Sequence, residues 1–230
     1  APTPAARAHA LNQLAKELGQ QGNHAEALTT AEEACELARE AGELAAEAEA
    51  LRLQGWAHLQ KGDYSTAMQR FEESLKMFEE IGDRSGVAIV TGNIGNVYKS
   101  LSEYEKSLEY FTRALALHEE LGERSGVALV TGNIGSVYQG LSDYEKSLEY
   151  YTRALSLHEE LGDRSGVALV TGNIGAVYHS LSEYGRALEY YTRALALHEE
   201  LGERSGVARG TGNIGTLYAD KAFNDYNPTK

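Results

Sequence analysis

The sequence contains very little of several features that would indicate other kinds of protein. Cys35 is the single cysteine among 230 residues, so no disulfide can form within the chain. An unpaired thiol suits a reducing compartment, and we expect a cytoplasmic protein. Only three prolines are present, at positions 2, 4 and 228, so the interior is free of the strongest helix breaker. Long helices are therefore permitted over nearly the whole chain.

Positive charge is also scarce. The chain has 21 Lys and Arg against 34 Asp and Glu, a formal net charge of −13. Nucleic-acid binding needs clustered basic side chains, so the sequence predicts no nucleic-acid partner, and the same deficit argues against anionic membrane surfaces. No run approaches the roughly 20 apolar residues of a membrane helix, and no signal peptide is visible. The acidic balance favours a basic or amphipathic protein segment as partner.

A repeat dominates the sequence. The segment that begins at Gly82, Gly-Asp-Arg-Ser-Gly-Val, returns with small changes at positions 122, 162 and 202, which gives a period of 40 residues. Tyr104, Tyr144 and Tyr184 keep the same step, and counting back from Tyr104 reaches Tyr64 and then His24. A fixed period in this range is typical of a solenoid.

Each repeat contains two apolar stripes with helical spacing. The first stripe consists of Val90, Ile94, Val97, Tyr98 and Leu101. The second consists of Tyr104, Leu108, Phe111, Ala114, Leu115, His118 and Leu121. Asp83 or Ser85 can cap the first helix, and Gly122 suits the residue after the second helix, where a positive φ is needed. Neither stripe can be buried by one hairpin alone, so neighbouring hairpins must stack.

The phase of the repeat divides the chain. We predict five repeats that start near residues 8, 48, 88, 128 and 168, and a closing half-repeat over 208–222. The fold is then all-α, a single solenoid over 8–222 with eleven helices, the last from Val207 to about Ala219. Residues 1–7 are interpreted as an N-terminal linker remnant, and residues 223–230 as a frayed C-terminal tail.

Small and large residues alternate along the repeat in a pattern that resembles the tetratricopeptide repeat, the TPR. The pattern is carried by Gly95, Tyr98, Tyr104, Ser107, Phe111 and Ala114, and by Gly55, Tyr64, Ala67 and Phe71 one repeat earlier. The 40-residue unit is longer than the usual 34 and resembles the arrays of LGN/Pins-type scaffolds and of bacterial signalling proteins. The resemblance implies a right-handed superhelix of antiparallel hairpins whose concave groove is lined by the first helices and binds a protein or peptide.

The face of the first helix opposite the core stripe holds the candidate binding residues. An asparagine recurs there unchanged in successive repeats, as Asn93, Asn133, Asn173 and Asn213. Apolar residues precede it at Ile89, Leu129 and Leu169, and the row ends in Arg209. Positions that vary between repeats, and would supply selectivity, include Asn96, Lys99, Gln139 and His179. An asparagine amide both donates and accepts, so the constant row can hold the backbone of an extended peptide.

Each of these features has a plainer interpretation. The asparagines could instead link adjacent helices or fix a turn of their own repeat. Gly95 is best explained by close helix packing, whereas Gly92 either lets the next repeat approach or opens the helix face to a ligand backbone. Repeats three to five are nearly identical. The alternative to a peptide-binding scaffold is therefore a structural or idealised array without a specific ligand, with weak end-to-end self-association.

Catalytic chemistry has no visible basis in the sequence. His118, His158 and His198 recur, but ligands must lie about 2 Å from one metal ion and packed helices lie about 8–10 Å apart, so we expect an interface role. Cys35 lies on a stripe with Ala31, Ala34 and Ala38 and lacks a histidine placed to activate it. We predict no enzyme activity, no metal site and no cofactor.

Overall fold

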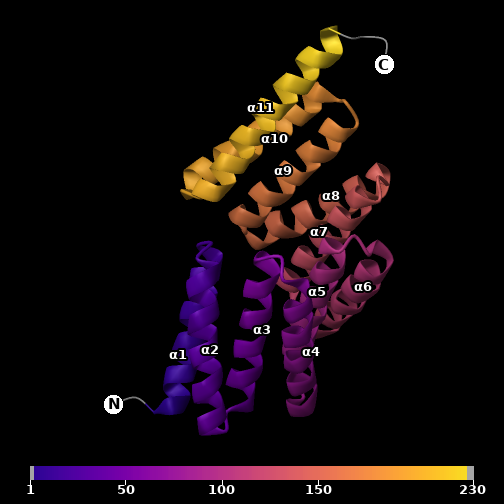
Figure 1. The fold of residues 1–230 in the computed structure, drawn as a ribbon. Coiled ribbons are helices and arrows are strands. Elements are labelled where there is room, and N and C mark those ends of the chain that lie inside the picture. The colour runs from indigo at the N-terminus through magenta and orange to yellow at the C-terminus, as the bar shows by residue number, and fades with distance from the viewer. Residues whose placement is uncertain (1–2, 227–230) are drawn as a thin grey trace. The chain divides into compact units, whose positions relative to one another are not determined.

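The computed structural model of the chain describes residues 3–226, and the side chains of residues 3–222. Over these residues it contains eleven α-helices and no strand (Figure 1). Their bounds are α1 Pro4–Gln20, α2 His24–Ala41, α3 Leu44–Gln60, α4 Tyr64–Ile81, α5 Arg84–Ser100, α6 Tyr104–Leu121, α7 Arg124–Gly140, α8 Tyr144–Leu161, α9 Arg164–Ser180, α10 Tyr184–Leu201 and α11 Arg204–Tyr226. The predicted all-α fold and its eleven helices are confirmed. No helix in the described part of the chain has the length and apolar character needed to cross a membrane.

The helices form two compact units, α1 to α6 and α7 to α11, with the division after Leu121. In the first unit each helix from α1 to α6 contacts the next one, and α3 also contacts α1 and α5. In the second unit α7 to α11 repeat this pattern, and α9 also contacts α7 and α11. Within each unit, hairpins therefore stack with their first helices side by side, as in TPR-like solenoids. The continuity of the two units in one solenoid over residues 8–222 stays a prediction.

Local sequence explains where the helices begin and end. The Asp83 carboxylate accepts a hydrogen bond from the backbone N–H of Gly86 (2.9 Å), so Asp83 is the N-cap of α5. Asp163 does the same for α9 through Gly166 (2.9 Å). Gly122 follows α6 at φ 69°, the left-handed conformation predicted for it. The two turn signals thus lie where the repeat pattern places them.

The ends of the array differ from the prediction. Helix α1 begins at Pro4, four residues before the expected start, because Pro suits the first helical position and Thr3 Oγ1 accepts from the Ala6 N–H (3.2 Å). Helix α11 continues to Tyr226, beyond the expected end near Ala219 and into the tail that was predicted to fray. Residues 219–226 contain neither Gly nor Pro, so nothing in them stops the helix. Positions 227–230 lie outside the described residues.

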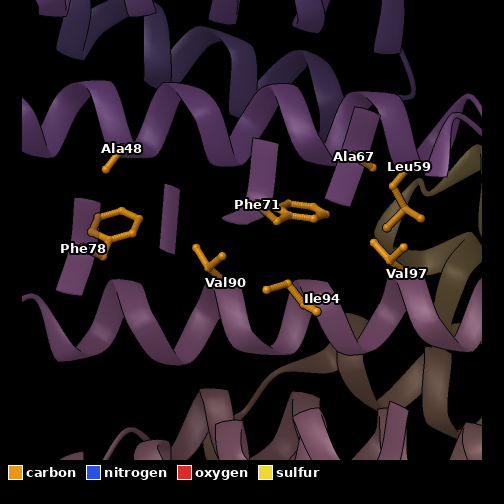
Figure 2. Close-up of a cluster of buried hydrophobic side chains, with 8 residues drawn as sticks. All are labelled: Ala48, Leu59, Ala67, Phe71, Phe78, Val90, Ile94 and Val97. Carbon is orange, nitrogen blue, oxygen red and sulfur yellow. The ribbon is translucent and has the colours of Figure 1, made fainter. Parts of the chain in front are cut away.

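The core lies between successive first helices and is filled from the second helix. Figure 2 shows Phe71 and Phe78 of α4 in the space between α3 and α5, together with Ile94. In the second unit Tyr151 of α8 takes the corresponding place against Ile174. These residues confirm most of the predicted apolar stripes. Leu101 and Leu121, at the stripe ends, are instead exposed, Leu101 directly after α5 and Leu121 as the last residue of α6.

A glycine on each of the first helices α3, α5, α7 and α9 receives the aromatic ring of its own hairpin. A Cβ atom added to Gly95 would lie 2.9 Å from Cδ1 of Phe111, and one added to Gly135 would lie 2.9 Å from Cδ1 of Tyr151. These distances are too short for any larger residue, so the predicted packing role of Gly95 is confirmed.

Candidate functional site

The face of the first helices that carries the asparagine row has its clearest form in the second unit. Asn133, Asn173 and Asn213 lie on α7, α9 and α11, and α9 contacts both of the other helices. The structure therefore brings these three asparagines onto adjacent helices. Each is half-buried. Leu129 and Leu169, one turn earlier on α7 and α9, have 55% and 37% of their surfaces exposed.

The asparagine side chains of this face are unsatisfied, in contrast to buried polar residues nearby. Ser147 Oγ donates to the backbone oxygen of Gly135 (2.9 Å), and Thr131 Oγ1 donates to that of Val127 (2.6 Å). The side chains of Asn133, Asn173 and Asn213 make no hydrogen bond to residues 3–222, over which side chains are described. Their amides thus have donors and acceptors available for water or a ligand.

Three further predicted residues lie on α5 in the first unit. The Asn93 Nδ2 atom is closed off from solvent and has no hydrogen-bond partner, whereas Asn96 Nδ2 donates to the Gly92 oxygen (3.2 Å). Burial lowers the pKa of Lys99, and its ammonium group has no ion-pair partner within residues 3–226. The Lys99 ammonium and the Asn93 amide are therefore each able to interact with an anionic or carbonyl group.

Two of the predicted selectivity residues are held by the protein itself. Gln139 Oε1 accepts a hydrogen bond from the Tyr151 hydroxyl (3.1 Å), and burial raises the pKa of that hydroxyl to about 12, so it keeps its proton. His179 Nε2 lies 2.9 Å from Asp220 Oδ2, which links α9 to α11. Both side chains are therefore positioned by contacts within their unit.

Arg209 ends the apolar row that runs through Leu129 and Leu169. Its Nη2 atom lies 3.4 Å from Nε2 of His198 on α10, and the residue as a whole is exposed. The side chain therefore adds positive charge at the edge of the asparagine-bearing face on α11.

Sequence reasoning missed part of this face in the first unit. Helix α3 places Glu49, Arg52 and Trp56 one repeat before Ile89, Gly92 and Asn96, and α3 contacts α5. The Arg52 guanidinium donates to both carboxylate oxygens of Glu49, at 2.7 and 2.6 Å. Subtracting 40 from the residue numbers of the asparagine-bearing face would have identified these residues, although the sequence of this repeat has diverged.

The recurring histidines are interface residues. His158 and His198 are buried, and a Cβ atom on Gly166 or Gly206 would lie within 2.3 Å of their Nδ1 atoms. His158 Nδ1 also lies 2.8 Å from Asp163 Oδ2, at the start of the next helix. Within residues 3–226, no three His, Cys, Asp or Glu side chains are grouped so that they could hold a metal ion.

Cys35 is likewise an interior residue. It packs with Ala34, Ala50 and Leu51, and burial raises the pKa of its thiol. A thiol that keeps its proton is a weak nucleophile.

Solved structures with the same fold include BtubC (BKLC) from P. vanneervenii, with a TM-score of 0.70 and 24% identity over 87% of this chain and 84% of that one. The Rap conjugation gene regulator of plasmid pLS20, in complex with the Phr* peptide, matches with a TM-score of 0.78 and 14% identity over 93% of this chain and 61% of that one. A Rap protein complexed with Competence and Sporulation Factor matches with a TM-score of 0.71 and 13% identity, over 96% and 66%. The chain spans less than two thirds of the length of either Rap protein. At these identities the likeness shows the fold alone.

No curated protein matches the chain in sequence. The family model for the tetratricopeptide repeat matches three stretches, residues 6–80, 86–160 and 125–200, of which the last two overlap. Together these stretches cover well over half of the chain, and their phase agrees with the helical hairpins of both units. The protein therefore belongs to the tetratricopeptide repeat family.

Proposed function

We propose that the protein is a non-enzymatic scaffold that binds an extended peptide segment on the asparagine-bearing face of its first helices. The asparagine amides hold the peptide backbone, and the exposed leucines beside them contact its apolar side chains. Because Cys35 is unpaired, a cytoplasmic location is part of the proposal.

The observation that carries this proposal is the set of three unsatisfied asparagines on adjacent helices. The polar side chains of Ser147 and Thr131, which are fully buried in the same unit, find partners in their own chain. Asn133, Asn173 and Asn213 do not, although they recur at the same place in each repeat. Exposed Leu129 and Leu169 add apolar surface beside this polar row.

The glycines that precede the asparagines support the same interpretation. A Cβ atom on Gly132 would meet Ala154 and Val170 at 3.7 and 3.8 Å, and one on Gly172 would meet Ala194 at 3.6 Å. These are ordinary contact distances, so packing does not require glycine there. A glycine keeps the helix backbone open to a ligand that lies across it.

Structural relatives are consistent with peptide binding. The Rap regulator of pLS20 was solved in complex with the Phr* peptide, and another Rap protein with Competence and Sporulation Factor. The acidic balance of this chain favours a basic or amphipathic peptide, although the positive charges of Lys99 and Arg209 suit an acidic group locally.

The test is a titration with a peptide selected by display against the intact chain. A neutral hydrogen bond contributes about 0.5–1.5 kcal/mol, so Asn133→Ala and Asn173→Ala should each weaken binding roughly three- to tenfold. The double variant should weaken it by about the product of the two effects. Thr152→Ala, an exposed polar residue on α8, is the matched control and should leave affinity unchanged.

Melting of each variant separates the two interpretations of the asparagines. If affinity is unchanged while Asn133→Ala and Asn173→Ala lower the melting temperature sharply, the row links helices and the proposal is wrong. If no selected peptide depends on these residues, the alternative of a structural array without a specific ligand is favoured.

A further inference from the structure

Helix α11 differs from the first helices α3, α5, α7 and α9 because its glycine receives no aromatic ring. Gly55, Gly95, Gly135 and Gly175 lie against the rings of Phe71, Phe111, Tyr151 and Tyr191, respectively. A Cβ atom added to any of these four glycines would lie 2.7 to 2.9 Å from the nearest ring carbon, whereas one added to Gly215 would have nothing within 4 Å. The position that receives an aromatic ring in the four hairpins from α3 to α10 is therefore open on α11.

Exposure of the neighbouring side chains extends this open surface along α11. Ala168 and Thr171 of α9 are fully buried, whereas Ala208 and Thr211, which hold the same places on α11, are exposed. The other side of α11 is packed normally, since Leu217 is buried against Ala187 and Tyr191. One face of α11 thus joins the core and the face that a second helix would cover is open.

Two charges at the same end of the second unit lack the partners that their counterparts have. Arg124 and Arg164 each form an ion pair with a glutamate near the end of the second helix of their hairpin, Glu160 and Glu200. Glu159 pairs with Arg193 on the next second helix (3.0 Å). Arg204 and Glu199 occupy the corresponding positions one repeat later, and neither has an ion-pair partner among the described side chains of residues 3–222.

An open cleft of about 390 Å³ lies between these charges. It is lined by Glu199, Gly202, Arg204, Val207 and Ala208. A cleft at the corresponding position lies one repeat earlier. In addition to its residues from α8 and α9, it is lined by Arg193, Ala196, Leu197 and Glu200 of α10. In the earlier cleft α10 forms one side, so a helix with the residue pattern of α10 would enclose the later cleft.

We propose that the exposed face of α11 and the end of α10 form a docking surface for an amphipathic helix of a partner protein. The chemistry of that helix follows from the second helices of this chain. It carries Phe or Tyr over Gly215, Arg two residues later to pair with Glu199, and Glu nine residues after the aromatic to pair with Arg204. Phe111, Arg113 and Glu120 have this spacing, as do Tyr191, Arg193 and Glu200. This surface is separate from the asparagine-bearing face and its use does not depend on the proposed function.

The probe is a labelled synthetic peptide with the sequence of residues 184–201, titrated into the intact chain. We expect saturable binding that weakens at least tenfold when the peptide residue matching Tyr191 is alanine, because large buried aromatics dominate helix docking. Gly215→Leu should weaken binding by a similar factor, since the leucine fills the place of the ring. Gly185→Leu in the intact chain is the matched control, because Gly185 also has nothing within 4 Å of an added Cβ atom. This variant should bind the peptide with the affinity of the unchanged chain.

Charge exchange tests the register of the docked helix. Arg204→Glu should weaken binding several-fold, and a peptide with Arg in place of its Glu200 counterpart should restore it. Circular dichroism of Gly215→Leu and Arg204→Glu checks that both variants keep their helical content.

Three results would overturn the proposal. They are absence of binding at millimolar peptide, equal affinity for the chain and for Gly215→Leu, and failure of the charge exchange to restore affinity. Sedimentation of the chain alone provides the fourth test. If it forms dimers that Gly215→Leu abolishes, a second copy and not a partner helix covers the surface.

Discussion

At the scale of single residues, neighbouring glycines on one helix have different roles. Gly132 and Gly135 are three positions apart on α7, and both are glycine in every near-identical repeat. A side chain on Gly135 would overlap the buried ring of Tyr151, whereas one on Gly132 would make ordinary contacts. Packing therefore requires the second glycine and does not require the first.

This difference predicts opposite effects of the same substitution. Gly135→Ala should destabilise the protein by about 1–3 kcal/mol, because the Tyr151 ring is held in the core and must shift. Gly132→Ala should stabilise it by up to about 1 kcal/mol, because alanine has the higher helix propensity and fits the space. Urea unfolding of both variants measures the two changes. An unchanged or raised stability for Gly135→Ala would contradict the packing argument.

At the scale of elements, the turn inside each hairpin has a different residue type in the earlier and the later repeats. The residue that turns the backbone is glycine in the first two hairpins, with φ of 83° at Gly22 and 78° at Gly62. It is serine in the next three, where Ser102, Ser142 and Ser182 have φ of 60°, 59° and 59°. A residue with a Cβ atom is strained in this region, so the later turns hold a conformation that glycine adopts more easily.

Replacing such a serine should therefore stabilise its hairpin. We expect Ser142→Gly to raise the unfolding free energy by about 0.5–1 kcal/mol, since relief of the left-handed strain exceeds the added freedom of the unfolded chain. The reverse change, Gly62→Ser, should lower stability by a similar amount. Thermal unfolding of the two variants provides the comparison. A loss of stability in Ser142→Gly would mean that the serine side chain contributes more than its backbone strain costs.

At the scale of the molecule, each unit consists of helices that depend on their neighbours. Helix α9 contacts α7, α8, α10 and α11, while α11 contacts only α9 and α10 among the described helices. In repeat architectures, stability is approximately a sum of terms for each repeat and for each interface between neighbours. The helix with fewer neighbours is expected to open more often.

Hydrogen exchange measures this gradient directly. Helices α7, α9 and α11 share most of their sequence, so their intrinsic exchange rates are similar and differences in protection report their surroundings. We expect the amides of α11 to exchange faster than those of α9 within the second unit. Equal protection of both helices would contradict a nearest-neighbour array. Addition of the α10-derived peptide should slow exchange in α11 if that helix is covered.

The sequence by itself determined the all-α fold, the 40-residue phase, the two helices of each repeat and the packing role of Gly95. The helix starts and ends depend on groups within a few positions of one another, such as the Asp83 cap and the left-handed Gly122, and the role of Gly95 follows from the repeat pattern. The ends were less predictable, because the start of α1 at Pro4 and the extension of α11 to Tyr226 lie outside the near-identical repeats.

Only the tertiary structure decided which side chains of the candidate site are engaged. Gln139 accepts a hydrogen bond from the hydroxyl of Tyr151, 12 residues away in the sequence. His179 lies within hydrogen-bond distance of Asp220, 41 residues away. The sequence placed both on the same face as Asn133, which has no such partner. The reason is that helical periodicity assigns a residue to a face, but the neighbour that satisfies its polar atoms comes from another helix. The same physics leaves Gly215 and Arg204 of α11 and Glu199 of α10 uncovered, although the sequence of α11 closely resembles those of α5, α7 and α9.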